Sequence, residues 1–331
     1  MRVKRLLSAF RTRQMHKVTG FKYLDLKRAV QHRYDDVEYA HDGATLLTKQ
    51  QAASLLRQLA ATLRVLISGR CDVMNRIHFP VLRAIDCSDS SAEDPLSHYV
   101  IRSCPMLTQL TVGTMDSDAL QALPDQLQVL RIESFEGHDI HSVSKLTSLT
   151  HLSVTADCLR ISSGFFSDMH DLVTVNLTAY LVEEEEDGDS ADDGEHAEHR
   201  QRFGDEDVRV LLQNNEKLVN VSICGFPISS QSLQYFTRYV QRHGLQQLTI
   251  KSSISLSDDA VTQLAKTGAK NRMQQLAILS DDPEEDMVIR IKKNDVQSPV
   301  LEVVIGSSAG PDYNETFAQL VSCILNDDTV T

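Results

Sequence analysis

Residues 107–112 read LTQLTV, residues 127–132 read LQVLRI and residues 149–154 read LTHLSV. Each six-residue unit is apolar at its first, fourth and sixth positions. Successive side chains of a β-strand point to opposite faces, so the fourth and sixth residues share one face while the third and fifth share the other. The unit therefore predicts a strand with one side buried in a core and the other side facing outward.

The same unit recurs along most of the chain, and its copies begin 25, 20, 22, 23, 46, 27, 28 and 27 residues apart. Seven of these eight intervals fall within the roughly 20–29 residues typical of leucine-rich repeats. Such units stack because none can bury its apolar side alone. The nine copies are Leu82/Ile85/Cys87, Leu107/Leu110/Val112, Leu127/Leu130/Ile132, Leu149/Leu152/Val154, Leu172/Val175/Leu177, Leu218/Val221/Ile223, Leu245/Leu248/Ile250, Met273/Leu276/Ile278 and Val300/Val303/Ile305.

The intervals predict an α/β fold, a leucine-rich-repeat solenoid over residues 61–331. We expect a curved parallel sheet on its concave side and helices or short turns on its convex side. Intervals of 27 and 28 residues leave room for amphipathic helices, as in SSQSLQYFTRYVQRHG (229–244) and SDDAVTQLAKTGAK (257–270). Intervals of 20 to 23 residues leave room only for short helices or 3₁₀ turns.

The long interval of 46 residues contains an acidic segment, residues 181–207, with 13 Asp or Glu against Arg200 and Arg202. This segment carries −11 of the chain's net charge of −13. It has few apolar residues, so we expect a disordered acidic loop that interrupts the solenoid. The loop could attract a basic partner. Binding of a metal through His196 and His199 is the weaker alternative.

Residues 1–60 are expected to form a basic N-terminal capping region, mostly helical. The first 24 residues hold seven Lys or Arg and no acid, with apolar residues near one helical face. A basic capping helix and a mitochondrial transit peptide both fit this composition. The six cysteines lack the close spacing of paired or metal-binding thiols, which favours free thiols in a reducing compartment.

Two phrases, IRSCPMLTQLTV (101–112) and LSDDAVTQLA (256–265), resemble the intracellular, cysteine-containing type of leucine-rich repeat. The stretches GFKYLDLKRAV (20–30) and LLTKQQAASLLRQLAATLRVLISGRC (46–71) are similar to the entry into the repeats of F-box/leucine-rich-repeat proteins. An F-box itself is not evident ahead of residue 20. The resemblance implies a substrate-recognition subunit of a cullin-type ubiquitin ligase.

The outward positions of the strands form the expected binding surface, since the concave sheet of a solenoid is where partners usually bind. These positions are mainly small and polar, which suits recognition of a protein surface. They suit nucleic acid poorly, because phosphate binding requires many Lys or Arg. The candidate partner-binding residues are Gln109, Thr111, Arg131, Glu133, His151, Ser153, Asn176, Asn220, Gln247 and Lys251.

Composition and motifs favour a non-enzymatic interaction module. The sequence contains no phosphate-binding glycine loop, dinucleotide fingerprint or nucleophile elbow, so we expect no catalytic residues, cofactor or structural metal. No apolar run reaches the ~20 residues needed to span a bilayer, and no membrane partner is expected. The expected location is cytoplasmic or nuclear, with a mitochondrial assembly or structural factor as the alternative.

Overall fold

A computed structural model describes residues 22–26, 47–90, 95–135, 140–157, 161, 164–180, 203–252 and 256–280. It also describes the backbone of two strands at 287–293 and 299–305. The chain divides into two compact units, Met1–Ala156 (unit 1) and Asp157–Thr331 (unit 2).

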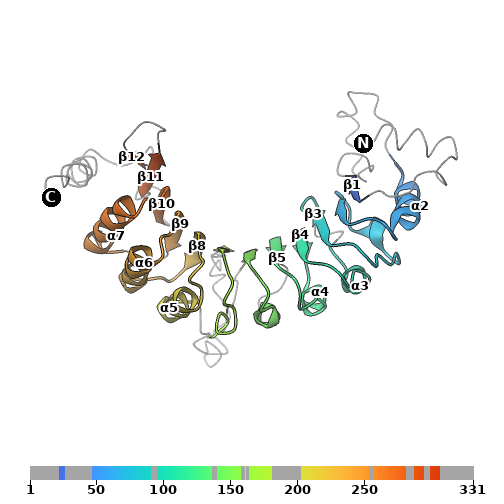
Figure 1. Ribbon diagram of the computed structural model, residues 1–331, viewed down its shortest axis with the longest axis horizontal. Helices are drawn as coiled ribbons and strands as arrows, with labels where there is room; N and C mark the ends of the chain where they lie inside the picture. The colour runs from blue at the N-terminus through green and yellow to red at the C-terminus, as the bar shows by residue number, and fades with distance from the viewer. Residues whose placement is uncertain are drawn as a thin grey trace, which may run out of the picture. The chain divides into compact units, whose positions relative to one another are not determined.

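Unit 1 contains one parallel sheet whose strands follow one another in sequence order (Figure 1). Short helices lie between successive strands, along one side of the sheet. The strands are β1 (Tyr23–Asp25), β2 (Val65–Ile67), β3 (Ala84–Cys87), β4 (Gln109–Met115), β5 (Val129–Phe135) and β6 (His151–Asp157). The helices are α2 (Lys49–Leu59), η3 (Asp72–Met74), α3 (His98–Arg102), α4 (Ser117–Gln121) and η4 (His141–Lys145).

The register of unit 1 places equivalent residues of each repeat side by side. Leu110 lies opposite Leu130, and Leu130 lies opposite Leu152. All three are fully buried, and burial of one such side chain stabilises a fold by about 1.5–3 kcal/mol. The predicted in-register stacking of the repeat is therefore confirmed.

Unit 2 combines four parallel strands with longer helices, as the longer intervals predict. Its parallel strands are β7 (Thr174–Tyr180), β8 (Asn220–Phe226), β9 (Gln247–Ser252) and β10 (Gln275–Ser280). Its helices α5 (Asp205–Asn214), α6 (Ser230–Arg242) and α7 (Asp258–Lys270) pack side by side along the sheet (Figure 1). Ser257 caps α7 by accepting a hydrogen bond from Ala260 N, and Gly244, with φ +76°, follows the end of α6.

The parallel strands with a helix or turn after nearly every one form a leucine-rich-repeat solenoid, which confirms the predicted fold class. Two copies of the unit were not recognised in the sequence. Leu24 and Leu26 belong to the copy in β1, and Leu63 and Leu66 belong to the copy in β2. Residues 23–25 are therefore a strand within the region expected to be mostly helical. The other described residues of 1–60 flank β1 or form α2 and its flanks.

The ninth predicted copy, 300–305, is a strand but not a parallel repeat. β11 (Met287–Lys293) follows β10 and pairs with it antiparallel, and β12 (Pro299–Ile305) pairs antiparallel with β11. The prediction of a parallel sheet to the end of the chain was therefore wrong for this copy. Alternation of apolar residues specifies a strand's buried face but not its direction.

The acidic loop predicted over 181–207 ends earlier than expected. Phe203 is fully buried, Gly204 is the N-cap of α5, and residues 205–207 form the first turn of that helix. Acidic side chains are favourable there because the first turn of a helix carries partial positive charge. Residues 181–202 lie outside the described part of the chain.

An aromatic cluster in unit 2 buries the side chain of Phe203. Its ring lies edge-on to Phe166 and Phe226, with centroids 6.0 and 5.1 Å away. Phe165 extends the cluster through Phe166 at 4.8 Å. These rings fix the chain at the point where it re-enters the repeats after the acidic segment.

Candidate functional site

The open face of unit 1, defined as the outward positions of its strands, includes two rows of side chains that follow the register. Both rows cross β1 to β6, and neighbouring strands lie ~4.8 Å apart. The first row is Tyr23, Val65, Ala84, Gln109, Val129 and His151. The second row is Asp25, Ile67, Asp86, Thr111, Arg131 and Ser153.

A hollow of about 370 Å³ lies on this face, over β2 to β6. We call it the β2–β6 hollow. Four of its five apolar residues lie on β2 and β3 and the fifth, Val129, lies on β5, whereas its polar and charged residues come from β3 to β6. It is lined by Val65, Ile67, Ala84, Ile85, Asp86, Gln109, Thr111, Val129, Arg131 and His151.

Two side chains of opposite charge lie at separate positions in the lining. Asp86 and Arg131 occupy the same row with Thr111 between them, so their strands are two spacings, ~10 Å, apart. The Oδ1 atom of Asp86 accepts a hydrogen bond from Ser88 N at 3.1 Å. Among the described residues, none makes an ion pair or hydrogen bond with the Arg131 side chain. The guanidinium is exposed and open to an external carboxylate.

The His151 ring is oriented by its neighbour in the chain. Its Nδ1 atom lies 2.8 Å from Thr150 Oγ1. Thr150 Oγ1 also donates to Gln128 O at 3.0 Å. Which of the two atoms, Thr150 Oγ1 or His151 Nδ1, donates in this contact depends on the tautomer of the ring. The imidazole is thus held at the β6 end of the hollow.

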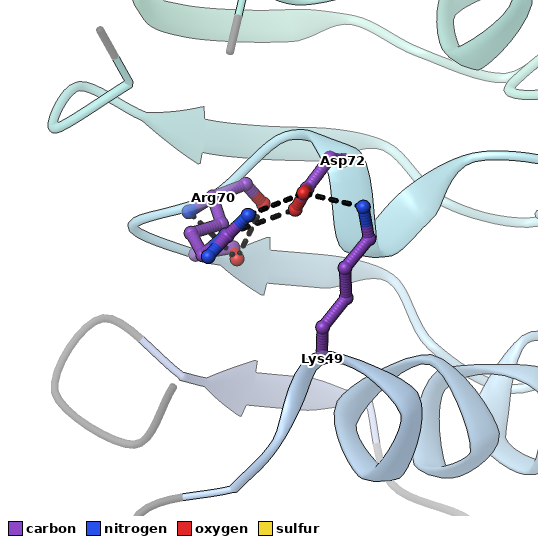
Figure 2. Close-up of polar contacts among 4 residues, drawn as sticks. Lys49, Arg70 and Asp72 are labelled. Carbon is purple, nitrogen blue, oxygen red and sulfur yellow. Dashed lines mark hydrogen bonds and ion pairs between the residues drawn. The ribbon is translucent and has the colours of Figure 1, made fainter. Parts of the chain in front are cut away.

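A polar cluster fixes the chain where it leaves β2 (Figure 2). Asp72 accepts hydrogen bonds from the Arg70 guanidinium, at 3.0 Å from Nε to Oδ1, and its Oδ2 lies 2.7 Å from Lys49 Nζ. Burial raises the pKa of the Asp72 carboxyl, but the hydrogen bonds and charges of Arg70 and Lys49 outweigh it and hold this pKa below its ordinary value. Lys49 begins α2, so the cluster ties this helix to the loop after β2.

The structure places four of the ten predicted site residues in the lining of the hollow: Gln109, Thr111, Arg131 and His151. Glu133 and Ser153 lie on the same strands as lining residues but outside the lining.

The other four predicted residues lie on the strands of unit 2. Asn220 and Gln247 are register partners there. Lys251 is paired with Cys224, a half-buried thiol whose pKa is raised by burial. Asn176 is the register partner of Ser222, one row away from Asn220 and Gln247.

Sequence reasoning missed the apolar part of the hollow. Val65 and Ile67 come from β2, a strand that was not expected, and Asp86 is not among the ten predicted residues. A signal was available in LRVLIS (63–68), where Leu63 and Leu66 occupy the first and fourth positions of the unit and are fully buried. The sixth position of this copy is the polar Ser68 instead of an apolar residue, so the copy departs from the repeat unit.

The described residues contain no group of three or more His, Cys, Asp or Glu side chains arranged to hold a metal ion. Within the same ranges, no helix has the length and apolar character required to cross a membrane. Cys71, Cys87, Cys104 and Cys224 are thiols that are not joined in disulfides, while Cys158 and Cys323 lie outside the described residues.

No family model and no curated protein matches this chain. Among solved structures, the chain is similar to TLR13 in its complex with ssRNA13, with 17% identity and a TM-score of 0.38 over 71% of this chain and 30% of that one. It thus spans less than a third of the TLR13 chain. It is also similar to a leucine-rich-repeat protein of Leptospira interrogans, with 13% identity and a TM-score of 0.39 over 84% and 68% of the two chains. Assignment of this chain to the leucine-rich-repeat fold rests on its own repeats and strand register.

Proposed function

We propose that the chain is a protein-binding module and that the open face of unit 1 contacts the partner. The observation that supports this function is the β2–β6 hollow, which is lined both by the exposed Arg131 of β5 and by partly exposed apolar side chains of β2 and β3. Arginine is among the residues most often found at the centre of protein interfaces, and surrounding contacts strengthen it by excluding water. The four predicted residues in the lining are consistent with this role.

A protein partner fits this face better than a nucleic acid. Among the residues that line the hollow, Arg131 is the only Lys or Arg, and Asp86 adds a negative charge. Nucleic-acid affinity comes largely from neutralising several phosphates with Lys and Arg. One guanidinium with a carboxylate two strands away instead favours a neutral or mixed-charge protein surface.

The test is the affinity of the double variant Arg131→Ala/His151→Ala for the main partner, identified by affinity purification with mass spectrometry. We expect binding to weaken by more than ~1 kcal/mol, about fivefold in Kd, while the fold stays intact. A matched control is His98→Ala/Arg102→Ala, which removes the same two residue types from α3 on the helical side of unit 1. Equal affinity of wild type and both variants contradicts binding at the hollow.

A narrower function, substrate recognition within a cullin-type ubiquitin ligase, is proposed on the resemblance of residues 101–112 to cysteine-containing repeats. In this stretch α3 ends at Arg102, Cys104 is fully buried, and the chain then enters β4. Co-purification of a cullin scaffold with the tagged chain from cytoplasm or nucleus supports this function. Loss of the first ~20 residues from mitochondrial protein supports the alternative of an imported assembly factor.

A further inference from the structure

We propose that the β2–β6 hollow binds an extended partner segment that places an acidic side chain on Arg131 and an apolar side chain four residues away against Val65 and Ile67. This inference rests on the proposed protein-binding function and specifies the chemistry of the partner. It follows from the order of side chains along one row of the open face and from the spacing of the strands that carry them.

The two ends of the row attract different chemistry. At one end, the Arg131 guanidinium is exposed and, within the described part of the chain, has no internal carboxylate partner. A carboxylate can accept two parallel hydrogen bonds from it. At the other end, Ile67 lines the hollow together with Val65 and Ala84 of the neighbouring row, and all three are partly exposed. Covering them with an apolar side chain removes apolar surface from water, the main favourable term in association.

The strand spacing gives the length of the segment. Arg131 on β5 and Ile67 on β2 belong to the same row and are three strand spacings, ~14 Å, apart. An extended segment advances ~3.3 Å per residue and returns a side chain to the same face every second residue. Residues i and i+4 of a segment lying along the row therefore reach Arg131 and Ile67.

The residue between them meets the polar middle of the row. Residue i+2 lies ~7 Å from residue i, between Thr111 and Asp86, the next two side chains after Arg131. A Lys, Arg or hydrogen-bonding side chain is favoured there because Asp86 is a carboxylate. The expected segment therefore has an acidic residue at position i, a basic or polar residue at i+2 and an apolar residue at i+4. The two residues between them can be of any type, and the segment can run in either chain direction.

The test is selection of random twelve-residue peptides displayed on phage against three immobilised full-length proteins: wild type, Arg131→Glu and Arg102→Glu. Arg102 is exposed on α3, so its variant makes the same charge change on the helical side of the unit. Circular dichroism verifies that all three proteins are folded. We expect wild type and Arg102→Glu to enrich an acidic residue four positions from an apolar one, and Arg131→Glu to lose the acidic preference.

Binding of a synthetic peptide carrying the enriched sequence then assigns the contact. Replacing its acidic residue with the matching amide should weaken binding to wild type about tenfold, and binding to Arg131→Gln less than twofold. No enriched peptide, a motif without the acidic residue, or the same motif on Arg131→Glu overturns the inference. If Arg131→Ala/His151→Ala still weakens the main partner in that case, open-face binding stands and only the segment chemistry is wrong.

Discussion

The side chain of Asn215 holds two neighbouring repeats of unit 2 together, and its removal should be costly. Asn215 is fully buried just after α5. Its Oδ1 atom accepts a hydrogen bond from Leu172 N at 2.9 Å, and its Nδ2 atom donates to Leu211 O at 3.0 Å. The Tyr239 hydroxyl donates to the backbone oxygen of Asn215 at 2.8 Å. The substitution Asn215→Ala therefore removes the first two bonds and leaves the third.

The magnitude follows from which groups lose a partner. A buried donor such as Leu172 N–H costs about 1–3 kcal/mol when left unsatisfied, and the bond to Leu211 O adds about 0.5–1.5 kcal/mol. We expect Asn215→Ala to lower the free energy of unfolding by about 2–4 kcal/mol. The adjacent Asn214 is the matched control, since its side chain also donates to two backbone oxygens but is only partly buried. Water can replace those bonds, so Asn214→Ala should cost about 1 kcal/mol or less.

Two measurements test this difference. Urea unfolding followed by far-UV circular dichroism compares the free energies of unfolding of the two variants. Amide hydrogen exchange at Leu172 then reports the contact itself, and protection there should fall in Asn215→Ala but not in Asn214→Ala. Equal destabilisation by the two variants, or unchanged exchange at Leu172, would refute the role given to the Asn215 side chain.

Three further predictions concern stability. Leu152→Asp buries an unpaired charge between repeats and should abolish cooperative melting of unit 1. The neighbouring Ser153→Asp on the open face should change the Tm little. Similar melting curves for the two variants would contradict the assignment of Leu152 to the core and of Ser153 to the open face. The pKa of Asp72 is lowered in the folded state, so its stabilisation is present above the unfolded value of about 3.9 and is lost as pH falls through the folded pKa. The stability difference between wild type and Asp72→Asn should therefore shrink in acid, and a pH-independent difference argues against the ion pairs. Phe203→Ala should lower the free energy of unfolding in denaturant by about 3–5 kcal/mol. The control Tyr180→Ala should lower it far less, because Tyr180 is 58% exposed. Equal losses in the two variants would exclude Phe203 as the residue that anchors the chain.

The repeat unit predicted the strands well because burial and periodicity depend on local sequence. Leu110, Leu130 and Leu152 lie in register and are buried, as the spacing of their units implies. Strand direction could not be predicted in the same way. The strand at 300–305 carries the same apolar spacing as a parallel copy, yet it pairs antiparallel because β11 precedes it.

The candidate site could be predicted only in part. The outward positions of Gln109, Thr111, Arg131 and His151 follow from strand alternation, and all four line the hollow. The hollow itself depends on which outward side chains are small or apolar on neighbouring strands, including the unexpected β2. The end of the acidic loop was missed because a single Phe203 anchors it, and one aromatic residue leaves no periodic signal.

Chemical labelling of the buried thiols in unit 1 can report local unfolding of the repeats. Cys71, Cys87 and Cys104 come from three consecutive segments of the array, and all three are buried thiols outside any disulfide. Burial raises the pKa of the Cys104 thiol to about 11, so almost no thiolate, the form that alkylating reagents attack, exists near neutral pH. A reagent can modify these positions only when the surrounding turn of the solenoid has come apart. The order in which the three sulfurs are labelled therefore distinguishes unravelling one turn at a time from opening in a single event.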